Sequence, residues 1–387
     1  MLRKSRLYFS MMCAALVLVS LLMTSSARAC EEEPQTLLSL YMNSDLIVLA
    51  KYESNGEGQK SFEDEYGYTL ETGRNLSITK IFKGQNDLKT VSFMFSEYHS
   101  NPNQTVEETD YEEGYNHEDY FDVSKIKIGG EYLFFLSKNK ETGEYSITDY
   151  VSGVKDLGGK SKLYEKNLNE LGEIAAAKEN QSALLTEWIV KSIENSETRN
   201  DGINDLAESF AGLSYQDEDP NFKDKGPFVI NDGYGIYTVG VAKNLTQTQT
   251  SRVSAVLYSM LQEAWFAEKP QYANYRISAI LGGINKSRLA VHAYNSLQTV
   301  GKEDVERKEM IMSFLTETVG DETLSKLYYD YSELEIKIGE AKKENTPEAK
   351  KQLKTMTASR DVLLKDFDKR FKFMFGRNFV PVEEKKA

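Results

Sequence analysis

The chain has 387 residues, with 60 Asp and Glu against 47 Lys and Arg, and a net charge of −13 at pH 7. Non-specific binding to nucleic acid or anionic lipid depends on clustered basic residues, whereas the longest basic clusters here are pairs such as Lys350-Lys351 and Lys385-Lys386. Composition and charge therefore exclude a nucleic-acid-binding function. The length also exceeds the roughly 250–300 residues at which a single core stops growing, and predicts two domains.

Residues 1–29 have the three parts of a secretory signal peptide. Three basic residues precede an apolar stretch from Leu7 to Met23, and a polar segment closes on Ala27-Arg28-Ala29. The apolar stretch is shorter than the about 20 residues of a membrane-spanning helix, and its small-x-small ending predicts cleavage after Ala29. We therefore expect a secreted or periplasmic protein that begins at Cys30. Because the leader holds four basic and no acidic residues, the mature net charge would be −17.

Cysteine usage singles out Cys30. The other cysteine, Cys13, leaves with the signal peptide, so no intramolecular disulfide forms in the mature chain. A single exported cysteine indicates a free thiol, an intermolecular disulfide or a lipid attachment site. Bacterial lipoproteins are acylated at a cysteine in this position, but their usual lipobox differs from Ala27 and Arg28 here. Soluble export is expected, and a membrane anchor through an acylated Cys30 is the alternative.

The first half of the mature chain has the alternation of half-buried strands. Leu46 to Ala50 is a continuous apolar run suited to a buried strand, and Val91, Phe93 and Phe95 alternate with polar residues. Further short strands with turn signals between them follow as far as Val154. The pattern predicts a small antiparallel barrel or sandwich.

An acidic, tyrosine-rich insertion lies between Glu97 and Asp122, without Lys or Arg. Hard cations take oxygen ligands, so one interpretation is a site for calcium or for a cationic partner. The other interpretation is a solvated loop. It is favoured because the Asp-x-Asp-x-Asp-Gly spacing of a calcium-binding loop is absent. His99 and His117 flank or lie in the insertion, where they have either a metal-binding or a solvated role.

From Lys162 onward the apolar residues follow the helical period of 3.6. We expect the helices of residues 162–380 to pack as a bundle or an irregular solenoid, with Trp188 and Trp265 in the core. The predicted apolar stripes comprise Leu184, Leu185, Trp188, Ile189 and Ile193; Val253, Val256, Leu257, Met260, Leu261, Ala264 and Trp265; Met310, Ile311, Phe314 and Leu315; Leu324, Leu327, Tyr328 and Tyr331; and Leu353, Val362, Leu363, Phe367 and Phe371. Residues 217–240 interrupt the period with Pro and Gly, and form either a loop or a small hairpin.

Four short motifs resemble, in this order, the amino-terminal domain of the tissue inhibitors of metalloproteinases and the wider netrin-like family with its OB-type barrel. They cover about residues 30–155 and are a starting cysteine, Cys30; the segment Ser44-Asp45-Leu46-Ile47-Val48-Leu49-Ala50-Lys51; the segment ending in Phe82-Lys83-Gly84; and Gly130-Glu131-Tyr132-Leu133-Phe134 with the hairpin at Gly143-Glu144-Tyr145. The resemblance implies a multidomain α+β chain in which an antiparallel OB-type barrel precedes an all-α domain.

In that family the amino group and carbonyl of the first cysteine chelate the catalytic zinc of a target protease. The resemblance therefore implies Cys30, with the neighbouring Glu31 and Glu32, as candidate partner-binding residues, and an extracytoplasmic metalloprotease as a candidate partner. A terminal amine and its own carbonyl form a five-membered chelate, and a catalytic zinc keeps an open position. The family's Cys-x-Cys start is replaced here by Cys30-Glu31-Glu32-Glu33.

Motifs of known enzymes are missing from the sequence. It has three histidines and neither His-Glu-x-x-His nor Gly-x-Ser-x-Gly. His292 lies among apolar residues and is expected on a helix surface or as a satisfied interior histidine. We therefore expect a non-enzymatic exported binding protein without an intrinsic metal, cofactor or catalytic residue. An exported hydrolase or metal-dependent enzyme, with a site assembled from scattered residues, is the alternative.

Overall fold

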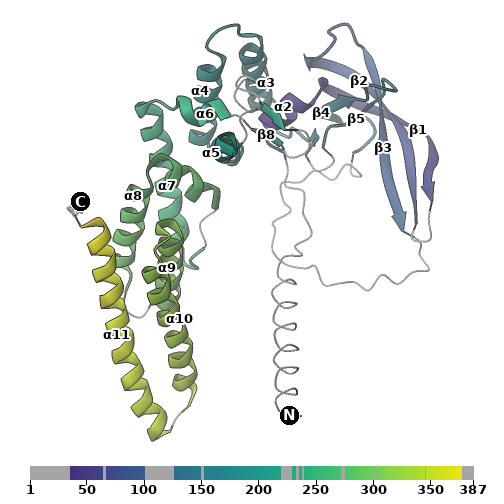
Figure 1. The fold of residues 1–387 in the computed structure, drawn as a ribbon. Helices are drawn as coiled ribbons and strands as arrows, with labels where there is room; N and C mark the ends of the chain where they lie inside the picture. Colours follow the sequence, from purple (N-terminus) through teal and green to yellow (C-terminus); the bar gives the residue numbers. More distant parts are fainter. Residues whose placement is uncertain are drawn as a thin grey trace, which may run out of the picture. The chain divides into compact units, whose positions relative to one another are not determined.

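The computed structural model describes residues 35–63, 67–100, 126–149, 152–218, 229–231, 235–237, 239–271, 275–301, 304–344 and 346–376. The chain is a mixed α/β structure in which a sheet precedes a set of helices (Figure 1). It forms two compact units, the first containing Gln35 and residues 40–166, the second residues 36–39 and 167–376. The short helix α2 (Leu37–Asn43) therefore contributes to both units.

Among its described residues the first unit has six strands. They are β1 (Leu46–Glu63), β2 (Gly67–Lys83), β3 (Thr90–Ser100), β4 (Glu131–Lys138), β5 (Tyr145–Ile147) and β6 (Val154–Lys155). Strand β1 pairs antiparallel with β2 and β4, β2 with β3, and β4 with β5 and β6, whereas β3 and β5 are parallel. The pairings run from β1 through β2, β3, β5 and β4 back to β1, so each of these five strands pairs with two others of the five, and β4 also pairs with β6.

The core of the first unit consists of apolar side chains at alternate positions of these strands. Strand β3 contributes Val91, Phe93 and Phe95, which confirms the alternation predicted there. The Phe93 and Phe134 rings meet at 5.7 Å between their centres. The remaining buried members are Leu46, Val48, Ala50, Tyr52, Leu76, Ile126, Tyr132, Leu136, Ile147 and Val154.

Both faces of the β1–β4 pair are buried. Ile47 and Leu49 point away from the core residues of β1 and are nevertheless buried, as are Leu133 and Phe135 on β4. A strand covered on both faces has no position for a polar side chain. This explains why residues 46–50 form a continuous apolar run, and it confirms the buried strand that the run predicts.

The first three strands continue beyond the closed set of pairings. After Tyr52, β1 pairs with β2 alone, as β3 does after Met94, so a three-stranded ribbon extends to Glu63 and Ser100. Its register shifts between Tyr52 and Ser54, between Asn55 and Gly58, and between Lys60 and Phe62. Such irregularities hinder the pairing of an exposed edge with another chain.

The second unit is mainly helical. Its elements are α3 (Ser161–Ala176, shared with the first unit), α4 (Gln181–Glu194), α5 (Arg199–Glu218), α6 (Val239–Asn244), α7 (Gln247–Phe266), α8 (Tyr275–Thr299), α9 (Val305–Val319), α10 (Glu322–Lys343) and α11 (Pro347–Phe375). A hairpin of β7 (Val229–Asn231) and β8 (Gly235–Tyr237) lies between α5 and α6. The hairpin predicted as one alternative for residues 217–240 is confirmed. The expectation of an all-α second half is wrong at this point, because two apolar β-forming segments pair there.

The side chains of the predicted helical stripes are buried or half-buried except at two positions. Trp188 and Trp265 are buried, as predicted for core residues. Leu184 and Val362 are exposed, because each lies one position beyond the buried arc of its helix. Helix α8 is interrupted at Asn285, whose side chain accepts a hydrogen bond from the Arg288 N–H at 2.9 Å and so begins the second half of the helix.

Candidate binding site

The first described residue, Gln35, is held by the loop between β5 and β6. Its backbone N–H donates to Ser152 Oγ at 3.1 Å, and its side-chain oxygen accepts a hydrogen bond from Asn43 at 3.2 Å. Ser152 is buried, and its N–H donates to the Asp149 carboxylate at 2.9 Å. The Ser152 hydroxyl donates to the same carboxylate oxygen. The chain is therefore fixed five residues after Cys30.

Gly153 allows this loop to turn back on itself. Its N–H donates to the Asp149 carbonyl oxygen at 2.7 Å. A Cβ atom at this position would lie 2.4 Å from that oxygen and 2.5 Å from Ile147 Cγ2. Both distances are below van der Waals contact, so the loop that holds Gln35 requires glycine here.

Three hydroxyl groups join the end of α2 to the sheet. Ser44 Oγ donates to the Leu40 carbonyl at 2.7 Å and lies 2.8 Å from Thr148 Oγ1. Ser137 Oγ donates to the Asn43 carbonyl at 3.0 Å and lies 2.9 Å from the same threonine hydroxyl. The last carbonyls of a helix have no partner within it, and these hydroxyls supply one.

Lys83 completes this corner of the first unit. Its Nζ donates to the Tyr41 carbonyl at 2.7 Å and to the Met42 carbonyl at 3.4 Å, and lies 4.8 Å from the centre of the Tyr41 ring. Burial lowers the pKa of Lys83, and Asp45 opposes that shift. A cation at a helix carboxyl end is stabilised by the helix dipole. The lysine of the Phe82-Lys83-Gly84 motif therefore has a structural role.

Gly84 has a backbone conformation that favours glycine, with φ of +108°. A Cβ atom would lie 2.8 Å from the Leu46 side chain and 3.0 Å from the Asp45 carbonyl oxygen. Asp45 accepts a hydrogen bond from the Lys138 N–H at 2.7 Å through its carboxylate. Asp45, Lys83 and Gly84, from two separate motifs of the sequence, thus meet at one corner.

The candidate residues Cys30, Glu31 and Glu32, and the cleavage site after Ala29, lie outside the described residues. So does most of the acidic insertion, including His117. His99 is described, on β3. It stacks on Tyr68 with ring centres 5.1 Å apart, and its Nε2 lies 4.0 Å from the Glu97 carboxylate.

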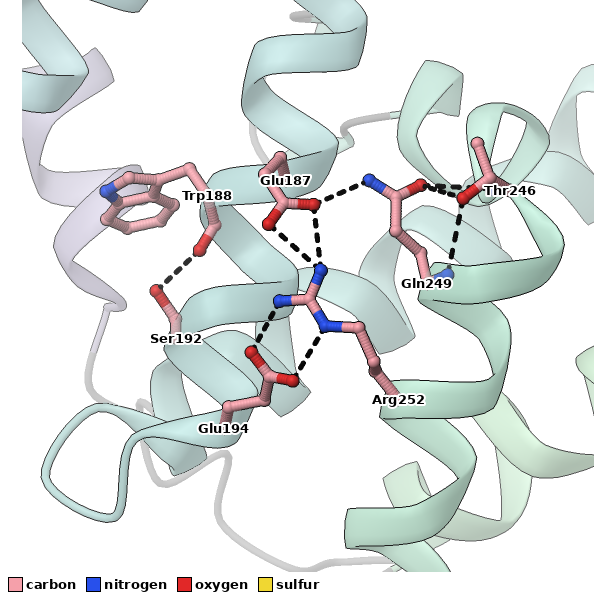
Figure 2. A network of polar contacts seen from close by, with 7 residues as sticks. All are labelled: Glu187, Trp188, Ser192, Glu194, Thr246, Gln249 and Arg252. Carbon is pink, nitrogen blue, oxygen red and sulfur yellow. Dashed lines mark hydrogen bonds and ion pairs between the residues drawn. The ribbon is translucent and has the colours of Figure 1, made fainter.

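A polar network in the second unit joins α4 to α7 (Figure 2). The Arg252 guanidinium from α7 lies between Glu187 and Glu194 of α4, at 3.0 Å from the first carboxylate and 2.5 Å from the second. Gln249 donates to Glu187 at 2.9 Å. Gln249 also forms the capping box that begins α7, with Thr246 as its partner. Four side chains therefore fix the position of α4 relative to the start of α7.

The ionisation of this network indicates a structural role. Burial opposes the shift at Glu187, but hydrogen bonds from Gln249 and Arg252 and the Arg252 charge hold its pKa below the ordinary value. A hydrogen bond and the charge of Arg252 likewise lower the pKa of Glu194 against the effect of burial. The two carboxylates in turn raise the pKa of Arg252. A general acid or base needs a pKa near the working pH, whereas these groups keep their charges. Sequence reasoning missed the network, although the seven-residue spacing of Glu187 and Glu194 places both carboxylates on one helix face.

The neutral form of His292 on α8 is favoured by its surroundings. Gln262 Nε2 lies 3.0 Å from His292 Nε2, and the Tyr258 ring centre is 4.4 Å from that of the imidazole. Burial, and secondarily Arg288, lowers the pKa of His292 to about 4. Of the two roles that the sequence left open, a histidine on the helix surface and a hydrogen-bonded interior histidine, the structure supports the second.

Within the described ranges no group of three or more His, Cys, Asp or Glu is arranged to hold a metal ion. Over the same ranges no helix combines the length and apolar character that crossing a membrane requires. No protein-family model matches the chain, and no curated protein has a matching sequence.

Proposed function

We propose that the chain is an exported, non-enzymatic binding protein whose first unit is an OB-type barrel of the netrin kind. The barrel presents the segment that begins at Cys30 to a protein partner outside the cytoplasm. The observation that carries this proposal is the circuit of pairings β1-β2-β3-β5-β4-β1 with its single parallel step, β3–β5. An OB fold is a five-stranded Greek-key barrel, and the circuit fits that description.

The positions of the resemblance motifs support the same proposal. The motif around Asp45 begins β1, the motif ending at Gly84 forms the end of β2, and the motif at Glu131 begins β4. Asp45, Lys83 and Gly84 meet at the α2 corner. Each motif is weak alone, and the shared corner gives the first two strand motifs one physical explanation, which is to fix helix α2.

The anchoring of Gln35 limits where a partner would bind. Five residues span at most about 17 Å, and Gln35 is held by the loop of Asp149 and Ser152. A group bound by Cys30 therefore lies within that distance of Gln35. The partner's surface would contact the β5–β6 loop, and the acidic Glu31 and Glu32 would favour a basic rim around the partner's site.

The sharpest form of the proposal is inhibition of a zinc metalloprotease. A free amino group and carbonyl at Cys30 would occupy the open position of the catalytic zinc. The resemblance suggests this chemistry. It requires a chain that is cleaved after Ala29 and not acylated, since an amide-blocked nitrogen is a poor zinc ligand. An acylated Cys30 would instead make the chain a membrane-anchored lipoprotein.

The experiment compares the chain that begins at Cys30 with a variant that carries one additional alanine before it. Both are assayed against a panel of extracytoplasmic zinc metalloproteases, and a third variant, Cys30→Ser, keeps the terminal chelate. We expect inhibition by the Cys30 and Cys30→Ser forms and its loss in the extended form. Equal inhibition by all three would contradict the chelation mechanism. Hydrolysis of a substrate by the purified chain, abolished by a chelator, would favour the enzyme alternative.

A further inference from the structure

Three carboxyl groups share one face of α5 in the second unit. Asp201, Asp205 and Glu208 are spaced by four and three residues, so their side chains lie on one side of the helix. Like charges at such spacings repel each other. Asp205 has only 6 % of its surface exposed, and the other two are half-buried. The helix therefore holds a buried carboxyl group between two further acidic side chains of the same face.

The start of α2 belongs to the second unit and contacts this face. The Thr36 hydroxyl donates to Asp205 Oδ1 at 2.6 Å, and the Leu37 N–H donates to Asp201 Oδ2 at 3.2 Å. Thr36 Oγ1 in turn accepts a hydrogen bond from the Ser39 N–H at 3.1 Å. The first N–H groups of a helix have no partner within it. Thr36 and Asp201 supply partners for two of them and so tie the start of α2 to α5.

Proton binding by Asp205 favours this contact. Burial raises the pKa of Asp205 well above the ordinary value, and the hydrogen bond from Thr36 opposes this shift. The charges of Asp201 and Glu208 raise the pKa further. A protonated carboxyl group keeps an oxygen that can accept from the Thr36 hydroxyl. The ionised group instead adds a buried negative charge beside two acidic neighbours, which is costly.

The elements packed around Asp205 bring other charged groups to α5. Residues 36–39 have no charged side chain. Lys191 of α4 and Lys243 of α6 are exposed, and Arg276 of α8 lines a cavity together with Glu208. The charges that raise the pKa of Asp205 come from its own helix. The protonation of Asp205 therefore depends on its burial and on the acidic face of α5.

We propose that the contact between Thr36 and Asp205 is a proton-dependent latch, which fixes the start of α2 on α5 when Asp205 is protonated and loosens when Asp205 ionises. Asp205 is then a positioning residue for the segment that follows the amino terminus. The latch is complete below about pH 4 and is lost as pH rises through the raised pKa of Asp205.

The consequence of the latch for binding rests on the proposed function. Cys30 lies six residues before Thr36, so the two are at most about 20 Å apart. A fixed Thr36 confines the terminus that presents Cys30, and this confinement reduces the entropy lost on binding. Inhibition of a metalloprotease at Cys30 should therefore be stronger when the latch is closed.

Hydrogen exchange of the chain from Cys30 onward tests the latch without a partner. Exchange of residues 35–43 is followed from pH 4 to pH 8 and corrected for the intrinsic dependence of exchange on pH. We expect the protection of these amides to fall by about tenfold over this range and to stay below that of the α7 amides. Protection that does not change with pH would overturn the latch, as would equal protection of the two segments at every pH.

Variants assign the effect to its residues. Asp205→Asn does not titrate and keeps an acceptor for Thr36, so its α2 protection should be independent of pH and about tenfold higher at pH 7 than in the unchanged chain. Asp330→Asn makes the same change at an exposed position of α10 and should behave as the unchanged chain does. A pH dependence that persists in Asp205→Asn would overturn the proposal.

A second pair of variants decides the matter if Asp205→Asn fails to fold. Thr36→Val removes the hydroxyl group, whereas Thr36→Ser keeps it, so only the first should lower the protection of α2. Equal protection in the two variants would overturn the latch. Exchange that follows these expectations supports the latch even where no metalloprotease is inhibited, and that result would count against the proposed function alone.

Discussion

The two units of the chain stabilise their polar groups in different ways. In the first unit, Ser44, Ser137 and Lys83 donate to backbone carbonyls beside an apolar core. In the second unit, charged side chains of different helices pair with one another, as Arg252 does with Glu187. Backbone carbonyls do not titrate, whereas carboxylates do. The ion pairs between helices therefore make the helical unit sensitive to pH and salt.

Two further ion pairs extend this contrast. Arg370 of α11 binds Asp321, the N-cap of α10, at 2.6 Å. Arg360 of α11 lies 3.5 Å from the nearly buried carboxylate of Glu335 on α10. Desolvation makes isolated buried charges costly, and pairing offsets that cost only while both partners stay ionised. The packing of α11 against α10 therefore also depends on charged side chains.

The largest effect is expected from the core of the first unit. Phe134 is fully buried on β4, so Phe134→Ala should reduce the free energy of unfolding of this unit by about 3–5 kcal/mol. Ile128→Ala removes an exposed apolar side chain of the same unit and should change it little. Denaturant unfolding monitored by hydrogen exchange in β1 and β4 measures both. A small loss in Phe134→Ala would contradict the role of this buried ring in the core of the first unit.

The next effect sharpens the role of charge in the second unit. Arg252→Met leaves Glu187 and Glu194 without their shared partner, and should cost about 1–2 kcal/mol after allowance for the exposure of these side chains. The control Lys337→Met breaks an exposed pair with Glu333 and should cost almost nothing. Denaturation of each variant at low and high salt gives the comparison. Equal costs for the two variants would show that the Arg252 network is not a helix clamp.

Asp205 predicts a pH dependence of the second unit. Its carboxyl group is buried and accepts a hydrogen bond from Thr36 at 2.6 Å. Burial raises its pKa well above the ordinary value, and Asp201 and Glu208 add to the shift. The folded state therefore holds this proton more tightly than the unfolded state, and its contribution to stability decreases as pH rises above about 3.9.

Asp205→Asn removes that titration and keeps an acceptor for Thr36. We expect the variant to be more stable than the unchanged chain by on the order of 1 kcal/mol at pH 7, with no gain at pH 3. Thermal unfolding at both values provides the test, with the exposed Asp330→Asn as the control. A variant that is less stable at pH 7 would show that Asp205 is needed as a charge.

We expect the smallest effect at His292, whose contribution to stability increases with pH, opposite to that of Asp205. Its pKa is lowered to about 4 in the folded state, so its contribution is complete above about pH 6.5 and is lost as pH falls towards 4. His292→Gln should flatten the stability profile between pH 8 and pH 6 by less than about 1 kcal/mol. A profile unchanged by His292→Gln would place the titration elsewhere.

The sequence predicted those features that depend on neighbouring residues along the chain. The buried run at Leu46, the alternation at Phe93 and the helical face of Trp265 each follow from a local period, and the structure confirms them. The Arg252 network joins residues that are distant in sequence, so no local pattern indicates it. The inclusion of residues 36–39 in the second unit likewise depends on Asp205, about 170 positions away.

We propose that the chain acts outside the cytoplasm through an amino terminus that begins at Cys30. The intact mass and amino-terminal sequence of the protein recovered from its native cell test this claim most directly. We predict the unmodified mass of residues 30–387 and a free cysteine at the first cycle. A mass that still includes residues 1–29 would contradict export through a cleaved signal peptide. A mass increased by a diacylglyceryl group and a further acyl chain would contradict the zinc-chelating terminus.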